Sequence, residues 1–486
     1  MLTHQQAVRF LHAATFGPKT PEFQYVLEQG ELAWLYDQSL IPPTLHRPKV
    51  LQLCQAGGYD QRQRQAVWWE RALTAPDQLR QRFAFAISEI LVISDVGDAL
   101  YTDPVGMAAY YDILLTHCFG TWRDLLYHIS KSPQMGRYLS HLRNSKANPS
   151  LGTTPDENYA REIMQLFSIG LWQLADDGSQ LAGPLPTYVQ ADVGELARVF
   201  TGWMYANSAN WYDNVPNDLP MVQFPAYHDV GSKQVMTTFF PANQTGEQDL
   251  LRCVDMLFNH PSCAPFICRQ LIQRLTHSNP PAAYISAVVA AWRQSGGDLK
   301  TVLVSILLNA TYFLDTDTKK FREPLLQATN IWRSLDAITT NGTTWDFDLP
   351  DYSYGQAALR APSVFNFFSP FANPPEAQLW NAVNVLNIIN GHYRAVYEPG
   401  SIRLDWNPPP NTANTLSLLM WVLGAFGPTT GATYVVSLLS FMLRANNVLA
   451  AEATEIEQAM ATIPSSRGKI EAAIYLMMAS PRSCAL

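Results

Sequence analysis

Apolar residues recur at helical spacing over most of the chain, and strand-like alternation is rare and short. Helices are therefore expected in two pieces over 3–40, then over 64–73, 76–94, 104–117, 122–132, 156–169, 191–202, 248–258, 264–275, 282–295 and 299–308, with two or three more from 411 to 480. The pattern predicts a mainly α protein, a large helical domain with long aromatic and proline-rich loops and a few short strands.

The chain reads as a single large domain, 1–486, with internal divisions. The expected divisions are an N-terminal helical part (1–205), an aromatic loop insertion (206–247), a second helical part (248–335), a long loop region (336–410) and C-terminal helices (411–486). Loops of this length inside one domain are usually functional or disordered, and their aromatic residues favour order.

Composition narrows the class of protein. Apolar residues make up 47% and charged residues 15% of the chain, so a large core is expected. The net charge is −8 and no run of Lys and Arg occurs, which excludes non-specific nucleic-acid binding. No stretch is apolar and long enough for a membrane span. The N-terminus lacks the basic start and apolar core of a signal peptide.

The six cysteines form no CxxC pair, and their spacing suits neither a zinc knuckle nor a redox motif. Free buried thiols are the simplest interpretation. In an exported protein, one disulfide could form, either Cys253–Cys263 or Cys263–Cys268.

The helix expected over 156–169 carries the first candidate chemistry. Asp156 can cap its start, and Gly170 can end it. At about 100° per residue, Glu157 and Arg161 lie opposite the apolar face, whereas Asn158 and Glu162 lie on its border. A half-buried Glu162 would have the raised pKa of a general acid or base. Alternatively, Glu157 and Arg161 form a surface pair and Glu162 braces a neighbouring helix.

The next helix, 191–202, places Asp192 within its apolar face and in its first turn. A carboxylate in the first turn is favoured by the free backbone amides and the helix dipole, and this structural role needs no catalytic function. The alternative is that Asp192 points across the core at Arg161 or at a bound ion. Both interpretations remain open from the sequence.

Histidines supply further candidates. His228 and Asp229 stand together in the aromatic loop, shortly before Lys233, and such a pair can act as a base or as metal ligands. His141 precedes the first candidate helix and could line the same cleft. A lone loop histidine is, however, more often only hydrogen-bonded.

Stronger signatures are absent from the sequence. It contains no HExxH, GxSxG, P-loop or strand-borne GxGxxG motif, so no nucleophile, metal or cofactor is predicted. Arg82 and Glu89, seven residues apart in the helix over 76–94, are expected to form a buried structural ion pair.

Several longer blocks stand out in order along the chain: TFGP at 15–18, DQLRQRFAFAISEI, MGRYLSHLRNSKA, DENYAREIMQLFSIGL, YVQADVGELARVFTGW, HDVGSK and APSVFNFFSP. These blocks resemble the bacterial DUF1800 family, whose function is undefined. The resemblance implies export to the periplasm or the extracellular space and association with a DUF1501-type protein, because members often look exported and often sit beside DUF1501 proteins.

The resemblance also selects residues. The positions that match are Glu157, Asn158, Arg161, Glu162, Asp192, Arg198, His228, Asp229 and Lys233. Many relatives have a His-Asn-His pattern in the third helical block and a histidine after an ARELLEL motif. Ser88, Glu89, Ile90 and Phe167 stand at those positions here, so a metal site built on those histidines is absent from this chain.

Two functions follow from these residues, and a third possibility is a metal site that uses His228 with Glu162 or Asp192. The first is a hydrolase or modifying enzyme acting on an extracytoplasmic polymer, with Glu162 as acid or base, Arg161 orienting the substrate and His228–Asp229 as a second catalytic pair. Glu157 and Asp192 complete the expected catalytic set, with Asn158, His141, Lys233 and Arg198 binding substrate. The second is a non-catalytic binding or assembly protein, in which these polar residues form a buried structural network.

Overall fold

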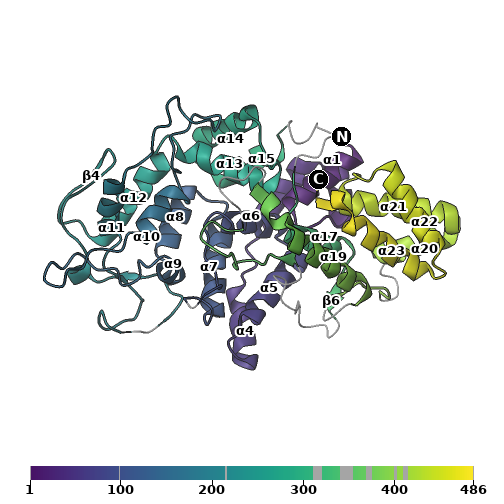
Figure 1. The fold of residues 1–486 in the computed structure, drawn as a ribbon, viewed down its shortest axis with the longest axis horizontal. Helices are drawn as coiled ribbons and strands as arrows, with labels where there is room; N and C mark the ends of the chain where they lie inside the picture. Colours follow the sequence, from purple (N-terminus) through teal and green to yellow (C-terminus); the bar gives the residue numbers. More distant parts are fainter. Residues whose placement is uncertain are drawn as a thin grey trace.

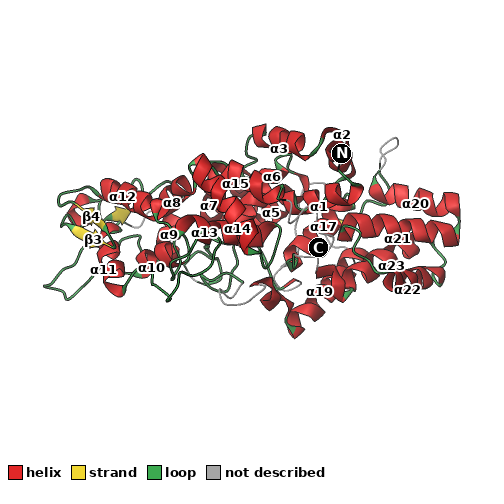
Figure 2. Ribbon diagram, turned by 90° about the horizontal axis from the view of Figure 1, so that it is seen from above, coloured by secondary structure: helices red, strands yellow, loops and turns green. Residues whose placement is uncertain are grey.

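A computed structural model describes residues 2–97, 99–213, 216–309, 320–339, 354–367, 375–398, 402–408 and 414–484. The molecule is elongated, with helices along its whole length and three two-stranded sheets (Figures 1 and 2). The prediction of a mainly α protein with a few short strands is confirmed.

The first part of the chain forms short helices that surround one fully buried helix. They are α1 (His4–Ala14), α2 (Thr20–Gln29), α3 (Glu31–Leu40), α4 (Arg47–Gly57), α5 (Gln61–Thr74), α6 (Gln78–Ser88), α7 (Pro104–His117), α8 (Trp122–Ser130) and α9 (Pro133–Tyr138). Every residue of α6 is buried, including the polar Gln78, Arg80, Gln81, Arg82 and Ser88. Its chain leaves the helix at Ser88, six residues earlier than the expected end at 94. The segment after it is held instead by Asp95, whose amide donates to the Leu359 carbonyl at 3.2 Å.

The middle of the chain builds one end of the molecule. It contains α10 (Asn158–Gln165), α11 (Gln190–Val199), β1 (Trp203–Met204), β2 (Val222–Gln223), η1 (Pro225–Tyr227), β3 (Lys233–Val235), β4 (Thr238–Phe240) and α12 (Gly246–Asn259). Strand β1 pairs with β2, and β3 with β4, both antiparallel. Figure 1 shows the β3–β4 hairpin beside α11 and α12 at this end.

Helices α13 (Cys263–Leu275), α14 (Ala282–Ser295), α15 (Leu299–Leu307) and α17 (Pro324–Ser334) continue the core toward the other end. The remaining elements are β5 (Ile338–Thr339), η2 (Pro375–Trp380), α19 (Ala382–Tyr397), β6 (Ile402–Arg403), α20 (Thr415–Phe426), α21 (Pro428–Arg444), α22 (Ala450–Ala461), α23 (Ser466–Ala479) and η3 (Pro481–Cys484). Most buried apolar residues of these helices and of the N-terminal part belong to one continuous core.

Two expectations about the second half need correction. The region 336–410 is not loop throughout, because α19 begins at the capping residue Asn381 and buries Ile388, Ala395 and Val396 on one face. Its asparagines, glycine and histidine hide that helical spacing in the sequence. Four helices, α20 to α23, close the chain instead of two or three. Part of the predicted aromatic loop at 340–375 lies outside the described residues.

The six cysteines are all buried and none forms a disulfide. Neither of the two pairings considered for an exported protein is therefore present. Burial raises the pKa of Cys253, Cys263 and Cys268, which keeps these thiols protonated and unreactive at neutral pH.

Candidate functional site

Helix α10 places Glu157 and Arg161 on the surface. Arg161 Nη2 donates to Glu157 Oε2 at 3.1 Å, and the two side chains are 37% and 40% exposed. Gln190, the first residue of α11, donates to Glu157 Oε2 at 2.8 Å and accepts from Arg161 Nη1 at 3.1 Å. Asn158 is also exposed. These residues join α10 to α11 in contact with water, as the surface-pair interpretation expects.

Glu162 lies on the inner side of α10 and is buried, with 7% of its surface exposed. Its Oε2 atom is buried without a hydrogen-bond partner. Burial raises the pKa of Glu162, and the positive charge of Arg161 opposes that rise. The pKa of Tyr138 is raised to about 12 by burial and by the negative charge of Glu162, which places the two side chains near each other. Burial thus favours the protonated form of the Glu162 carboxyl.

Asp192 uses both carboxylate oxygens to hold backbone. Its Oδ2 accepts the amide of Val189 at 2.8 Å, which caps the start of α11. Its Oδ1 accepts the amide of Met236, in the turn of the β3–β4 hairpin, at 2.6 Å. The first-turn role is therefore present, and it also ties the hairpin to α11.

Arg198, near the end of α11, binds the loop that precedes the β3–β4 hairpin. Its Nε and Nη2 atoms donate to the two oxygens of Asp229 at 2.8 and 3.1 Å, and Nη1 donates to Glu195 at 2.7 Å. Burial acts to raise the pKa of Asp229, but the hydrogen bonds from Arg198 and from the Gly231 amide outweigh it and lower that pKa. This bidentate pair fixes the position of the chain at 229–231.

His228, Lys233 and Asp249 form what we call the buried ion cluster. Lys233 Nζ donates to Asp249 Oδ2 at 2.7 Å, and neither side chain is exposed. The other Nζ donors bind the carbonyls of Asp229 and Gly231 at 2.6 and 3.0 Å. His228 Nε2 lies 3.2 Å from Asp249 Oδ2, also fully inside the protein. Because burying charges is costly, such a cluster persists only where pairing compensates the lost hydration.

Both ring nitrogens of His228 have partners. Nδ1 lies 2.9 Å from the Thr201 carbonyl and 3.2 Å from the Thr201 hydroxyl. Nε2 faces the Asp249 carboxylate, which accepts. Asp249 therefore stands between Lys233 Nζ and the imidazole ring of His228.

The structure brings part of the predicted site together. Arg198 binds Asp229 directly, and Lys233 binds the carbonyl of Asp229 and, through Asp249, meets His228. Asp192 joins the same hairpin through a backbone amide. Among the contacts described, none joins Glu162 to Asp192 or His228, and Glu157, Asn158 and Arg161 lie on the surface of α10.

Asp249 is the residue that sequence reasoning missed. It lies in the first turn of α12, four residues before the buried Cys253, and therefore on the same helix face. The helical spacing predicts that this carboxylate is buried and therefore needs a partner, and Lys233 and His228 lie close to it in the sequence. These two features could have identified Asp249 as their partner.

His141 lies elsewhere. Its ring stacks on Tyr159 with centroids 3.9 Å apart, and Nε2 bonds the Ser130 carbonyl at 2.9 Å. Burial lowers the pKa of His141 to about 4, so the ring is neutral at physiological pH. Its contacts are those of a histidine packed in the core beneath α10.

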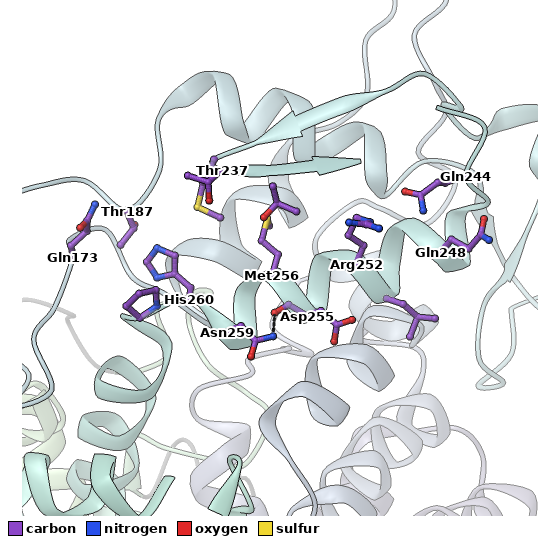
Figure 3. A pocket seen from close by; sticks show the side chains of 14 residues that line it. Gln173, Thr187, Thr237, Gln244, Gln248, Arg252, Asp255, Met256, Asn259 and His260 are labelled. Atoms are coloured by element: carbon purple, nitrogen blue, oxygen red, sulfur yellow. Dashed lines mark hydrogen bonds between the residues drawn. The ribbon is translucent and has the colours of Figure 1, made fainter. Parts of the chain in front are cut away.

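A groove borders the hairpin on the side facing α12, with a volume of about 730 Å³. We call it the α12 groove. Figure 3 shows Arg252, Asp255, Met256 and Asn259 rising from α12 as its floor, with the hairpin turn at Thr237 above them. The remaining lining residues come from the hairpin turn, from the ends of α12 and from the loop that follows α10: Gln173, Thr187, Met236, Thr238, Gln244, Gln248, Leu251, His260 and Pro261.

The groove mixes polar and apolar side chains, and both of its charged residues already have partners. Asp255 is already paired with Arg123, and Arg252 donates to the Phe239 carbonyl at 3.4 Å. Gln244 Oε1 is buried without a hydrogen-bond partner at one end of the groove. Burial lowers the pKa of His260, which favours the neutral ring. Four side-chain amides, which both donate and accept, also line the groove: Gln173, Gln244, Gln248 and Asn259.

A second polar cluster lies in the interior around Glu89, at the end of α6. Gln356 Nε2 donates to Glu89 at 3.3 Å and to Glu323 at 2.8 Å, and both carboxyls are buried. Burial and the charge of Glu323 raise the pKa of Glu89, while Arg274 and Arg82 act against that rise. Arg274 lies 3.7 Å from Glu89, and Arg82 Nη2 donates to the Arg274 carbonyl at 2.6 Å. The direct Arg82–Glu89 pair stays a prediction.

Neither a metal centre nor a membrane span is indicated by the part of the chain that the structure describes. No group of three or more His, Cys, Asp or Glu side chains in it is placed to hold a metal ion. No described helix combines the length and apolar character needed to cross a bilayer.

The geometry defines a helical protein with a closed ion cluster and a polar groove beside it. The family model described as "Protein of unknown function (DUF1800)" matches residues 9–483, so the chain belongs to the DUF1800 family. No curated protein and no solved structure matches the chain.

Proposed function

We propose that this protein is a binding protein whose ligand site is the α12 groove, and that the buried ion cluster and Asp192 hold the groove's upper wall in place. The observation that carries the proposal is the set of contacts around the hairpin. Asp192 holds the hairpin turn from α11, and Lys233 in β3 is paired with Asp249 of α12. The two walls of the groove are thus fastened to each other by a charge pair without exposed surface.

The chemistry of the lining favours an extended peptide as the ligand. Side-chain amides such as those of Gln173, Gln244 and Asn259 offer the same donors and acceptors as a peptide backbone. Met236 and Met256 supply adaptable apolar contacts for side chains. No Trp, Tyr or Phe lines this groove, which removes the stacking platform that a sugar chain would use. The volume of about 730 Å³ lies within the range of ligand sites.

The ligand peptide is tested by panning a random 12-residue peptide library against the purified protein and measuring Kd of enriched peptides by fluorescence anisotropy. Gln244→Ala and Arg252→Ala should each weaken binding about tenfold, since each removes a hydrogen-bonding group worth about 1–1.5 kcal/mol. Gln458→Ala and Arg62→Ala, on α22 and α5, are matched controls. Unchanged Kd in the groove variants, or no enriched peptide, would refute the proposal.

A DUF1501-type protein, the partner implied by family association, is the first natural source of such a peptide. Overlapping peptides that span a DUF1501-type protein can be assayed with the same variants. Peptides that bind wild type and the Gln458→Ala variant, but not Arg252→Ala, would assign that protein as the source.

A second candidate function rests on Glu162. A buried carboxyl with a raised pKa and an unpartnered oxygen suits general acid–base catalysis in a hydrolase or modifying enzyme. Glu162→Gln keeps the shape and removes the titrating group, so turnover of a polymer substrate should be lost while the melting temperature is retained. Activity that survives this change would rule out Glu162 as the catalytic group.

A further inference from the structure

The helical hairpin formed by α20 and α21 lies at the end of the molecule opposite the β3–β4 hairpin (Figure 2). Its sequence is unusual for an exposed element. From Trp406 to Leu443 the chain contains no charged residue and no histidine, although 15% of the whole chain is charged. The first charge after it, Arg444, is buried and bonded to Glu452. The hairpin therefore presents an electrically neutral surface.

Three aromatic side chains gather where the two helices meet. Trp421 and Phe426 of α20 have ring centroids 6.0 Å apart, and Phe426 and Tyr434 of α21 are 4.9 Å apart. They are 62%, 48% and 49% exposed. Only Gly427, with a φ of 75°, separates the two helices, so the cluster lies at the hairpin tip. We call Trp421, Phe426 and Tyr434 the tip aromatics.

An apolar groove of about 480 Å³ continues from the tip aromatics along the hairpin. Leu418 and Tyr434 line it on one side, and Phe23 of α2 lines it on the other. Leu418 and Met420 are themselves 43% and 36% exposed. Exposed apolar surface that is continuous over several residues marks an interaction site.

We propose that this hairpin docks on the surface of an electrically neutral lipid bilayer, with the tip aromatics at the boundary between headgroups and acyl chains. Charge complementarity carries the choice of partner. A charged ligand would find no counter-charge on the hairpin, and the nearest exposed charge on the adjoining α22 is the carboxylate of Glu455, which repels anionic lipid. Trp and Tyr are enriched at the bilayer interface, where one end of the ring is apolar and the other is hydrated.

The contact is peripheral and independent of the α12 groove. It needs no membrane-spanning helix, because an uncharged surface with aromatic anchors binds at the interface itself. A protein partner is less consistent with the surface, since protein interfaces carry arginines and a polar rim. Self-association through the same face is the competing outcome, and it is separated from lipid binding by experiment.

Co-sedimentation with phosphatidylcholine vesicles tests the proposal. Wild type should bind, and the triple variant Trp421→Ser/Phe426→Ser/Tyr434→Ser should lose at least tenfold in partition coefficient. The control Tyr59→Ser/Tyr101→Ser/Tyr212→Ser, which removes three aromatics elsewhere that are 61%, 58% and 80% exposed, should bind like wild type. Because no charge takes part, added NaCl should not weaken binding.

Several results would overturn the proposal. They are absence of wild-type binding, equal binding by the triple variant, and binding that requires phosphatidylserine and disappears with salt. A dimer that the triple variant abolishes, without vesicle binding, would assign the surface to a second copy of the chain. If the triple variant did not fold, Trp421→Ser alone should still lower the partition coefficient severalfold.

Discussion

The ion pairs Glu157–Arg161 and Lys233–Asp249 belong to neighbouring parts of the same end of the molecule, yet their surroundings differ completely. The first pair is 40% and 37% exposed, whereas the second has no exposed surface. Water screens the first and leaves it little net energy. The second cannot be broken without leaving a charge in the interior. The comparison teaches that burial, more than the presence of a charge pair, shows which polar residues hold this end together.

The Asp249→Ala substitution should have the largest effect on stability and tests the buried pair most strongly. It removes the only carboxylate that faces both Lys233 and His228 among the contacts described, so the buried Lys233 loses its counter-charge and His228 loses a hydrogen-bond partner. We expect a loss of about 3–5 kcal/mol in the free energy of unfolding, measured by urea denaturation. The double variant Asp249→Leu/Lys233→Met, which removes both charges of the pair, should recover part of this loss. A loss below about 1 kcal/mol would contradict the assigned role.

Arg198→Ala probes an intermediate environment. The Arg198 and Asp229 side chains are 24% and 19% exposed, so water can partly replace the lost hydrogen bonds. The expected loss is about 1–3 kcal/mol in the same denaturation assay. Arg198→Lys should recover only a fraction, because a lysine cannot make the bidentate contact. Equal stability of Arg198→Lys and wild type would show that geometry is unimportant here.

Glu162→Gln tests a pH dependence. A carboxyl with a pKa of about 4.3 in the unfolded chain and a raised pKa in the fold destabilises the folded state as the pH rises through that interval. The variant lacks this titration. The difference between the melting temperatures of the variant and of wild type should therefore increase as the pH rises from about 4 to about 8. A difference that stays constant over this range would show that Glu162 is not perturbed.

Glu157→Ala should give the smallest effect, below about 0.5 kcal/mol, because the pair is exposed. The same denaturation series measures it, with Glu455→Ala on the exposed face of α22 as the control. If Glu157→Ala lost as much unfolding free energy as Arg198→Ala, then Glu157, Arg161 and Gln190 would hold α10 and α11 together more strongly than their exposure implies.

Periodicity was a sufficient guide to the fold where helices are amphipathic. The sequence predicts a helix over 76–94, and α6 occupies the first part of that range. Helix α19 was missed because asparagines and a histidine interrupt its apolar face. Its burial depends on packing against α23, which no local pattern contains.

The candidate residues show the same limit. The sequence could place Asp192 in a first turn, but not reveal that its second oxygen binds Met236, forty-four residues later in the chain. It placed His228, Asp229 and Lys233 in one loop, yet their partner Asp249 lies on the next helix. Spacing identifies which residues share an element, whereas the pairing of elements arises from the whole fold.

The central claim is that the buried ion cluster fastens the β3–β4 hairpin to α12 and so forms the α12 groove. Amide hydrogen exchange of the Asp249→Asn variant tests it most directly. Protection should fall in the hairpin, residues 233–240, and remain unchanged in α23 at the opposite end. Unchanged protection of the hairpin in a variant that has lost this charge would contradict the claim.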